Sequence, residues 1–151
     1  MDPKDINWSS LGFGYMPTNS YVRTTWQDGK WSEPVLIKEP TITMSIAATC
    51  LHYGQAAFEG LKAFRQKDGK VRCLRPWENV KRMNLAADYM LAPAIPEELY
   101  IQMIQMVVKD NIEYVPPYGT GGALYIRPLL IGTGAQVGVS PSKMYDFLIL
   151  V

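Results

Sequence analysis

The sequence is poor in the residues that usually build disulfide frameworks and metal sites. Only two cysteines, Cys50 and Cys73, occur among its 151 residues, and their spacing fits neither a disulfide scaffold nor a zinc site. We therefore interpret both as small buried apolar side chains. His52 is the single histidine and the carboxylates are scattered, so no metal centre is predicted.

Long apolar runs and blocks of like charge are also missing. Fifteen basic and fourteen acidic residues give a formal net charge of +1, which favours neither nucleic acid nor a membrane surface as a partner. No apolar run reaches the roughly 18 residues of a membrane span. Residues 1–10 lack the apolar stretch of a secretion signal. We expect small-molecule or protein partners and a reducing, cytoplasmic setting.

What remains is enough apolar material for one folded domain, since 48% of the residues are hydrophobic and 19% are charged. The Asp28-Gly29 and Asp68-Gly69 pairs each separate two strand-like runs, which predicts two hairpins. Two further runs, residues 123–132 and 145–151, are typical of strands and are joined by a loop rich in Gly, Ser and Pro.

Two helices are predicted between these strands. The first begins near Pro76 and the second at Pro96. Each carries an apolar stripe at helical spacing, formed by Val80, Met83, Ala87 and Met90 in the first and by Tyr100, Met103, Ile104, Val107 and Val108 in the second. Hairpins with segregated helices indicate an α+β fold, largely an antiparallel sheet with two main helices on it.

Several catalytic motifs can be tested and set aside. Gly132, Gly134 and Gly138 have the wrong spacing for a dinucleotide loop, and Pro141 stands where the phosphate-binding helix would run. No P-loop and no nucleophile elbow occurs. From its residue type and surroundings alone, His52 is interpreted as a hydrogen-bonded structural residue.

Three stretches nevertheless form a recognisable set: LHYGQAAFEGLKAF (51–64), LRPWENVKRMN (74–84) and LYIRPLLIG followed by GVSP (124–141). In order and interval they resemble the N-terminal small domain of the branched-chain amino acid aminotransferases, which are fold-type IV pyridoxal phosphate enzymes. The resemblance implies transamination of leucine, isoleucine and valine with 2-oxoglutarate or glutamate by a homodimer.

The resemblance also implies a second, large domain that supplies the Schiff-base lysine. None of the nine lysines of this chain matches that position. We therefore expect residues 1–151 to be a small domain whose polypeptide continues beyond Val151. Such a domain would hold no catalytic residue and would be inactive alone.

The resemblance assigns roles to seven residues of this chain. Arg82 matches the arginine that binds the phosphate of pyridoxal 5'-phosphate, although its helix position alone favours a solvated face opposite the apolar stripe. Substrate-binding positions are matched by Phe58 and Gly60 in the side-chain pocket, by Tyr53 and Val139 reaching the partner subunit's site, and by Tyr125 and Arg127.

For the last two residues the strand period adds a local reason. Tyr125 and Arg127 alternate with apolar residues, so both side chains are expected on one face of their strand. The family match then gives Tyr125 a role at the carboxylate end of the substrate, and makes Arg127 the partner of the glutamate side-chain carboxylate.

Two other interpretations stay open at the level of sequence. One is another enzyme of the same fold type, a D-amino acid aminotransferase or an aminodeoxychorismate lyase. The other is a dimerisation or ligand-binding module without catalysis. A lysine-bearing domain encoded after residue 151 would exclude the second.

Overall fold

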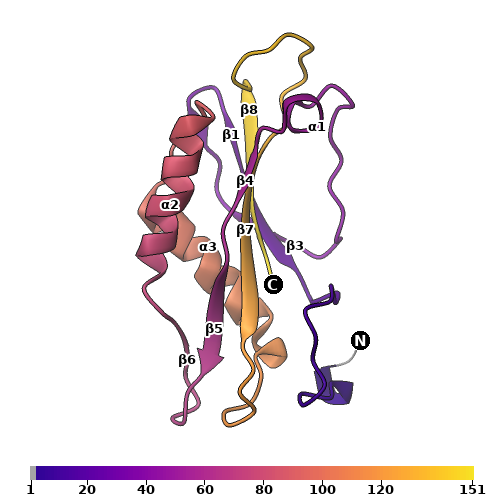
Figure 1. Cartoon of the computed structure of the whole chain (residues 1–151), viewed down its shortest axis with the longest axis vertical. Coiled ribbons are helices and arrows are strands. Elements are labelled where there is room, and N and C mark those ends of the chain that lie inside the picture. The colour runs from indigo at the N-terminus through magenta and orange to yellow at the C-terminus, as the bar shows by residue number, and fades with distance from the viewer. Residues whose placement is uncertain (1–2) are drawn as a thin grey trace.

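Eight antiparallel strands form one sheet in the computed structural model, which describes residues 3–151 (Figure 1). The strand order is β2-β1-β8-β7-β5-β6, with β3 paired to β1 and β4 paired to β7. The strands are β1 (Tyr21–Gln27), β2 (Lys30–Trp31), β3 (Val35–Ile37), β4 (Ala56–Phe58), β5 (Leu61–Arg65), β6 (Val71–Cys73), β7 (Leu124–Gly132) and β8 (Met144–Leu150).

The helices are α1 (Thr49–Tyr53), α2 (Pro76–Tyr89) and α3 (Glu97–Asp110), with short 3-10 turns η1 (Pro3–Asp5) and η2 (Ile112–Tyr114). Figure 1 shows α2 and α3 together on one side of the sheet, and α1 near the loop that joins β7 to β8. This is the antiparallel α+β architecture predicted from the sequence.

Both predicted hairpins are confirmed. In the first, Asp28 and Gly29 have φ of 52° and 84°, so both residues of the turn adopt the left-handed conformation that suits the twist of the flanking strands. Trp26 pairs with Trp31 directly beside it. The second hairpin joins β5 to β6 through a longer loop, in which Gly69 has φ 78° and Gln66 N donates to Lys70 O.

Both predicted helices are also confirmed at their starting prolines. Pro76 occupies the first turn of α2, where the missing N–H would have no intrahelical partner. Pro96 caps α3, and Glu97 and Glu98 follow in its first turn, where carboxylates interact favourably with the helix dipole. The predicted stripe of α3 is buried in full. On α2 Val80, Met83 and Ala87 are buried, whereas Met90, the fourth residue of that predicted stripe, is the C-cap and only half-buried.

The core lies between these helices and the sheet. Leu124, Ile126 and Leu130 of β7 alternate toward the helices, where they join Met83 and Met103 in the main apolar cluster. Fully burying a side chain of this size contributes about 1.5–3 kcal/mol. A smaller cluster on the opposite face of the sheet contains Tyr21, Ile131 and Leu148, and that face is only partly covered.

Two local features differ from the sequence predictions. Residues 49–58 form a short helix and a short strand, separated by Gly54 at φ 62°, where no element was predicted. Five helical and three extended residues are too few to show a period. Cys50 and Cys73 are free but only half-buried, so the prediction that they are buried was wrong in degree.

Candidate functional site

An arginine and two aromatic rings meet on the partly covered face of the sheet. The guanidinium carbon of Arg127 lies 4.5 Å from the centre of the Phe58 ring and 5.1 Å from that of Tyr125. Arg127 Nε also donates to Tyr125 Oη at 3.0 Å. The register brings these residues together, because Phe58 pairs with Leu129 across β4 and β7, two residues from Arg127. The prediction that Tyr125 and Arg127 share one face is confirmed.

Gly60 belongs to the same group of residues. A Cβ atom at this position would lie 2.6 Å from Tyr125 Oη, closer than real Cβ contacts, and 3.1 Å from Cε2 of the ring, which is an unusually tight contact. Any larger residue at this position would therefore force the Tyr125 side chain to shift. Four predicted substrate-binding residues, Phe58, Gly60, Tyr125 and Arg127, thus form one cluster, which we call the Arg127 cluster.

Three members of the Arg127 cluster, Phe58, Tyr125 and Arg127, line an open groove of about 1000 Å³. Its other wall is the segment of residues 8–16, from which the Phe13 ring meets Tyr125 edge-on with 4.9 Å between ring centres. Lys62 also lines the groove. The sequence analysis gave no role to Phe13 or Lys62, because a loop aromatic and a strand lysine carry no pattern of their own.

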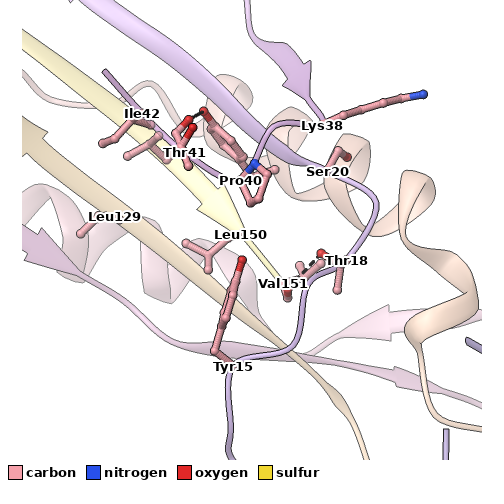
Figure 2. A pocket seen from close by; sticks show the side chains of 12 residues that line it. Tyr15, Thr18, Ser20, Lys38, Pro40, Thr41, Ile42, Leu129, Leu150 and Val151 are labelled. Carbon is pink, nitrogen blue, oxygen red and sulfur yellow. Dashed lines mark hydrogen bonds between the residues drawn. The ribbon is translucent and has the colours of Figure 1, made fainter. Parts of the chain in front are cut away.

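A second hollow of about 320 Å³ lies on the same face near the end of β8 (Figure 2). Tyr15, Leu129 and Leu150 line it, and Figure 2 shows the Lys38 side chain extending away from them. Thr18 Oγ1 donates to Val151 O at 3.3 Å along its edge. None of the predicted site residues lines this hollow, which is mostly apolar.

Arg82 lies on the helix side of the sheet, away from the Arg127 cluster. It projects from α2, and its side chain is 62% exposed. Its Nε donates to Glu59 Oε1 at 2.9 Å and its Nη2 to Glu59 Oε2 at 2.6 Å. Glu59 stands between Phe58 and Gly60, whose positions face the Arg127 cluster, so alternation directs its side chain to the other face. The structure thus places Arg82 on the exposed face expected from its helix position.

Glu59 is the less exposed partner of this ion pair, with a side chain 11% exposed. Burial alone would raise its pKa. The hydrogen bonds from Arg82 and Asn79 outweigh burial, so the pKa of Glu59 lies below its ordinary value. The carboxylate is therefore ionised at neutral pH.

Tyr53 is the last residue of α1, and Val139 lies in the loop that joins β7 to β8. The Tyr53 hydroxyl donates to the carbonyl of Val137, while Val139 is 83% exposed near the tip of the loop. Gln136 Nε2 donates to Ser140 O at 2.9 Å, a hydrogen bond within the loop that stabilises its conformation. Across residues 3–151, no hydrogen bond or ring contact joins Tyr53 or Val139 to the Arg127 cluster.

His52 and the glycine-rich loop behave as predicted. His52 Nε2 donates to Ile46 O at 2.7 Å, which fits a structural residue. The segment from Thr133 to Lys143 contains no phosphate-binding helix. Within the described part of the chain, no three His, Cys, Asp or Glu side chains gather as metal ligands. In residues 3–151 no helix has the length and apolar character of a membrane span.

Comparison with known proteins relates this arrangement to one family. The chain is 44% identical over 144 residues to a branched-chain-amino-acid aminotransferase of Haemophilus influenzae, covering 95% of this chain and 42% of that protein. It is 42% identical over 148 residues to branched-chain amino acid aminotransferase 2, chloroplastic, of Humulus lupulus, covering 97% and 36%. The predicted resemblance to branched-chain aminotransferases is confirmed.

The fold comparison agrees with the sequence comparison. A crystal structure of the T.th. branched-chain amino acid aminotransferase, complexed with N-(5'-phosphopyridoxyl)-L-glutamate, superimposes with a TM-score of 0.61 at 26% identity. The match covers 83% of this chain and 40% of that one. No family model matches the chain.

The matches cover only part of each relative. This chain spans about two-fifths of the length of the curated relatives, and over that length it is similar to branched-chain aminotransferases. Its antiparallel sheet with few helices is that of the small domain of these fold-type IV enzymes. The relatives are transferases by name.

Proposed function

We propose that this chain is the small domain of a pyridoxal 5'-phosphate-dependent aminotransferase that transfers the amino group of leucine, isoleucine or valine to 2-oxoglutarate. The observation that carries the proposal is the Arg127 cluster, in which a cation lies against an aromatic wall at an open groove. The names of the aligned relatives support transamination of branched-chain amino acids.

The Arg127 cluster has the two properties that this pair of substrates requires. Phe58 offers an apolar surface to a branched aliphatic side chain. Arg127 donates to Tyr125 through Nε, and among residues 3–151 its Nη groups have no hydrogen-bond partner, so both are available for a glutamate carboxylate. A guanidinium edge can bind a carboxylate through two parallel hydrogen bonds. Tyr125 fixes the direction in which that edge points, and we place the carboxylate end of the substrate near its hydroxyl.

Arg82 fits a role in binding the cofactor phosphate. Glu59 occupies Nε and one hydrogen of Nη2, which leaves the outer edge of a largely exposed guanidinium free. That edge suits a phosphate oxygen pair. When bound, the cofactor would withdraw electrons from the substrate Cα, which makes its proton removable.

The lysine that binds the cofactor covalently lies, in this proposal, in a large domain outside residues 1–151. The residues of this chain then orient the substrate, hold the phosphate and cover one side of the site, and the chain alone is inactive. Among the solved structures, the T.th. aminotransferase is also described with pyridoxamine 5'-phosphate, which supports the choice of cofactor.

Tyr53 and Val139 fit a role across a dimer interface better than a role in their own subunit's groove. Val139 is exposed on a loop whose shape is held by Tyr53 and Gln136. A loop fixed in this way can present an apolar side chain to a second subunit. We propose a homodimer on this basis. The cytoplasmic setting stays a prediction, since the aligned relatives include a chloroplastic protein.

The test is a coupled assay on protein expressed from the complete coding sequence. With pyridoxal 5'-phosphate, leucine and 2-oxoglutarate, we expect formation of glutamate and the branched 2-oxo acid, and none from D-amino acids. Residues 1–151 expressed alone serve as the comparison and should give no product. Absence of product from the complete protein would overturn the function, and turnover by residues 1–151 would overturn the division into domains.

A further inference from the structure

The carboxylate of Glu59 is the fixed member of its pair with Arg82. Asn79, one turn before Arg82 on α2, donates from Nδ2 to Glu59 Oε2 at 2.9 Å and to Gly60 O at 3.2 Å. Asn79 is itself buried. The carboxylate is therefore attached to a buried amide and to the short connection between β4 and β5, whereas Arg82 extends into solvent.

A second buried polar group, in the core, senses the charge of the same carboxylate. The Tyr100 side chain is fully buried, and within residues 3–151 its hydroxyl has no hydrogen-bond partner. Burial, and after it the nearby negative charge of Glu59, raise the pKa of Tyr100, so the phenol stays protonated and neutral. Tyr100 thus adds no negative charge that could compete with Glu59 for Arg82.

The geometry of the pair defines what Glu59 does to Arg82. Both carboxylate oxygens accept from one edge of the guanidinium, which fixes the plane of the group as well as its position. An unrestrained arginine side chain carries rotamer entropy that binding would otherwise have to overcome. Holding it in place before the ligand arrives reduces that cost.

We propose that Glu59 is a positioning residue that orients the free edge of Arg82 toward the phosphate group of the cofactor. This inference rests on the proposed function, because it assumes that Arg82 binds a phosphate. The phosphate binds the outer edge of the guanidinium, and Glu59 keeps the inner edge throughout.

The negative charge of Glu59 also has an opposite effect, since it repels a phosphate dianion. At the exposed end of Arg82 this repulsion is weakened by water and salt, with a screening length of about 8 Å at physiological ionic strength. Removing Glu59 would also let the Arg82 side chain become less ordered, and salt does not weaken that effect. Removing Glu59 should therefore weaken phosphate binding if Glu59 positions Arg82. If Glu59 only competed with the phosphate for Arg82, its removal would strengthen phosphate binding.

The experiment uses the apo form of the protein expressed from its complete coding sequence. Pyridoxal 5'-phosphate and, separately, pyridoxal, which lacks the phosphate, are titrated and binding is followed by absorbance. The variants are Glu59→Ala, Glu59→Gln, Arg82→Met and the double variant Glu59→Ala/Arg82→Met. Asp68→Asn is the matched control, because Asp68 forms an exposed two-bond pair with Arg72 that includes neither Glu59 nor Arg82.

We expect Glu59→Ala to weaken binding of pyridoxal 5'-phosphate on the order of tenfold, as for loss of a group that orients a charged ligand. Glu59→Gln, which keeps one acceptor, should fall between it and the parent protein, and it replaces Glu59→Ala if that variant does not fold. Pyridoxal binding should be unchanged in all of them. The double variant should bind no more weakly than Arg82→Met alone, because Glu59 acts only through Arg82.

Three results would overturn the inference. The first is unchanged or tighter binding of pyridoxal 5'-phosphate by Glu59→Ala while Arg82→Met weakens it, which would leave the proposed function intact. The second is an equal loss for pyridoxal, which would show a general structural effect. The third is unchanged binding by Arg82→Met, which would remove the phosphate role of Arg82 and the inference together.

Discussion

Arg127 lies over the ring of Phe58, with 4.5 Å between its guanidinium carbon and the ring centre. At an exposed site, the attraction between a cation and an aromatic ring contributes about 0.5–1 kcal/mol of interaction free energy. Phe58 is 64% exposed, so it supports the guanidinium without enclosing it. The same small area therefore presents an apolar surface and a cation, and different substrate side chains can use one or the other.

The first prediction concerns this division of roles in the complete protein. Arg127→Met should slow the half-reaction with glutamate far more than that with leucine, because only glutamate loses a charged partner. The expected difference is about 1.5–3 kcal/mol in transition-state free energy, the usual contribution of a hydrogen bond to a charged group. Single-turnover kcat/KM values for the two amino acids measure it.

Arg72→Met serves as the control for this experiment, since Arg72 pairs with Asp68 on the exposed second hairpin. It should leave both half-reactions unchanged. Equal losses for leucine and glutamate in Arg127→Met would instead show that Arg127 binds the α-carboxylate or supports the fold.

The second prediction concerns the close approach of Gly60 and Tyr125. In Gly60→Ala the new Cβ would lie 2.6 Å from Tyr125 Oη, so the tyrosine must move and release Arg127 Nε. Overpacking of this kind costs about 1–3 kcal/mol. We expect lower kcat/KM for both substrates and a lower midpoint of thermal unfolding. Gly138→Ala is the matched control, because no atom lies within 4 Å of its added Cβ. Equal behaviour of the two variants would contradict the packing argument.

Much of the fold follows from local signals in the sequence. Asp-Gly pairs mark the two hairpins, Pro76 and Pro96 mark the starts of α2 and α3, and period-two alternation places Tyr125 and Arg127 on one face. These features depend on neighbouring residues alone. The pairing of β4 with β7 depends instead on residues more than 70 positions apart. The three residues of β4 are too few to show an alternation from which this pairing could be predicted.

The site was predictable only in part for the same reason. The resemblance named Phe58, Gly60, Tyr125 and Arg127, and the structure brings them together. The sequence predicted no role for Glu59, although it stands between Phe58 and Gly60. A single carboxylate has no pattern of its own, and its importance comes from the distant residue that it contacts, Arg82.

The third prediction tests the main core. Leu130 of β7 is fully buried against the helices, whereas Leu85 of α2 is 59% exposed. Leu130→Ala should lower the free energy of unfolding by about 2–5 kcal/mol through lost burial and the cavity left behind. Leu85→Ala should change it by less than about 0.5 kcal/mol. The midpoint of urea unfolding, followed by tryptophan fluorescence, measures both. A similar midpoint shift in the two variants would contradict the assignment of the core.

The fourth prediction concerns how stability depends on pH through Glu59. Its pKa in the folded chain lies below the ordinary value of 4.5, because hydrogen bonds from Arg82 and Asn79 outweigh burial. A carboxyl group with a depressed pKa contributes stability that is present above its unfolded pKa and is lost as pH falls through the folded pKa. Glu59 should therefore stabilise the fold at neutral pH and progressively less below about pH 4.5.

The measurement compares the parent protein with Glu59→Gln between pH 3 and pH 7, taken as roughly the range over which a carboxyl group titrates. At neutral pH the variant should be less stable by roughly 0.2–1 kcal/mol, a small value because the Arg82 side of the pair is exposed to solvent. The difference should shrink as the pH falls, since Glu59 then becomes protonated in the parent as well. In an Arg82→Met background the main hydrogen-bond donor is gone, so burial offsets more of the lowering of the Glu59 pKa. The same Glu59→Gln substitution should then cost less, or even stabilise the fold, near neutral pH. A stability difference that is independent of pH in both backgrounds would mean that the ion pair does not contribute to folding.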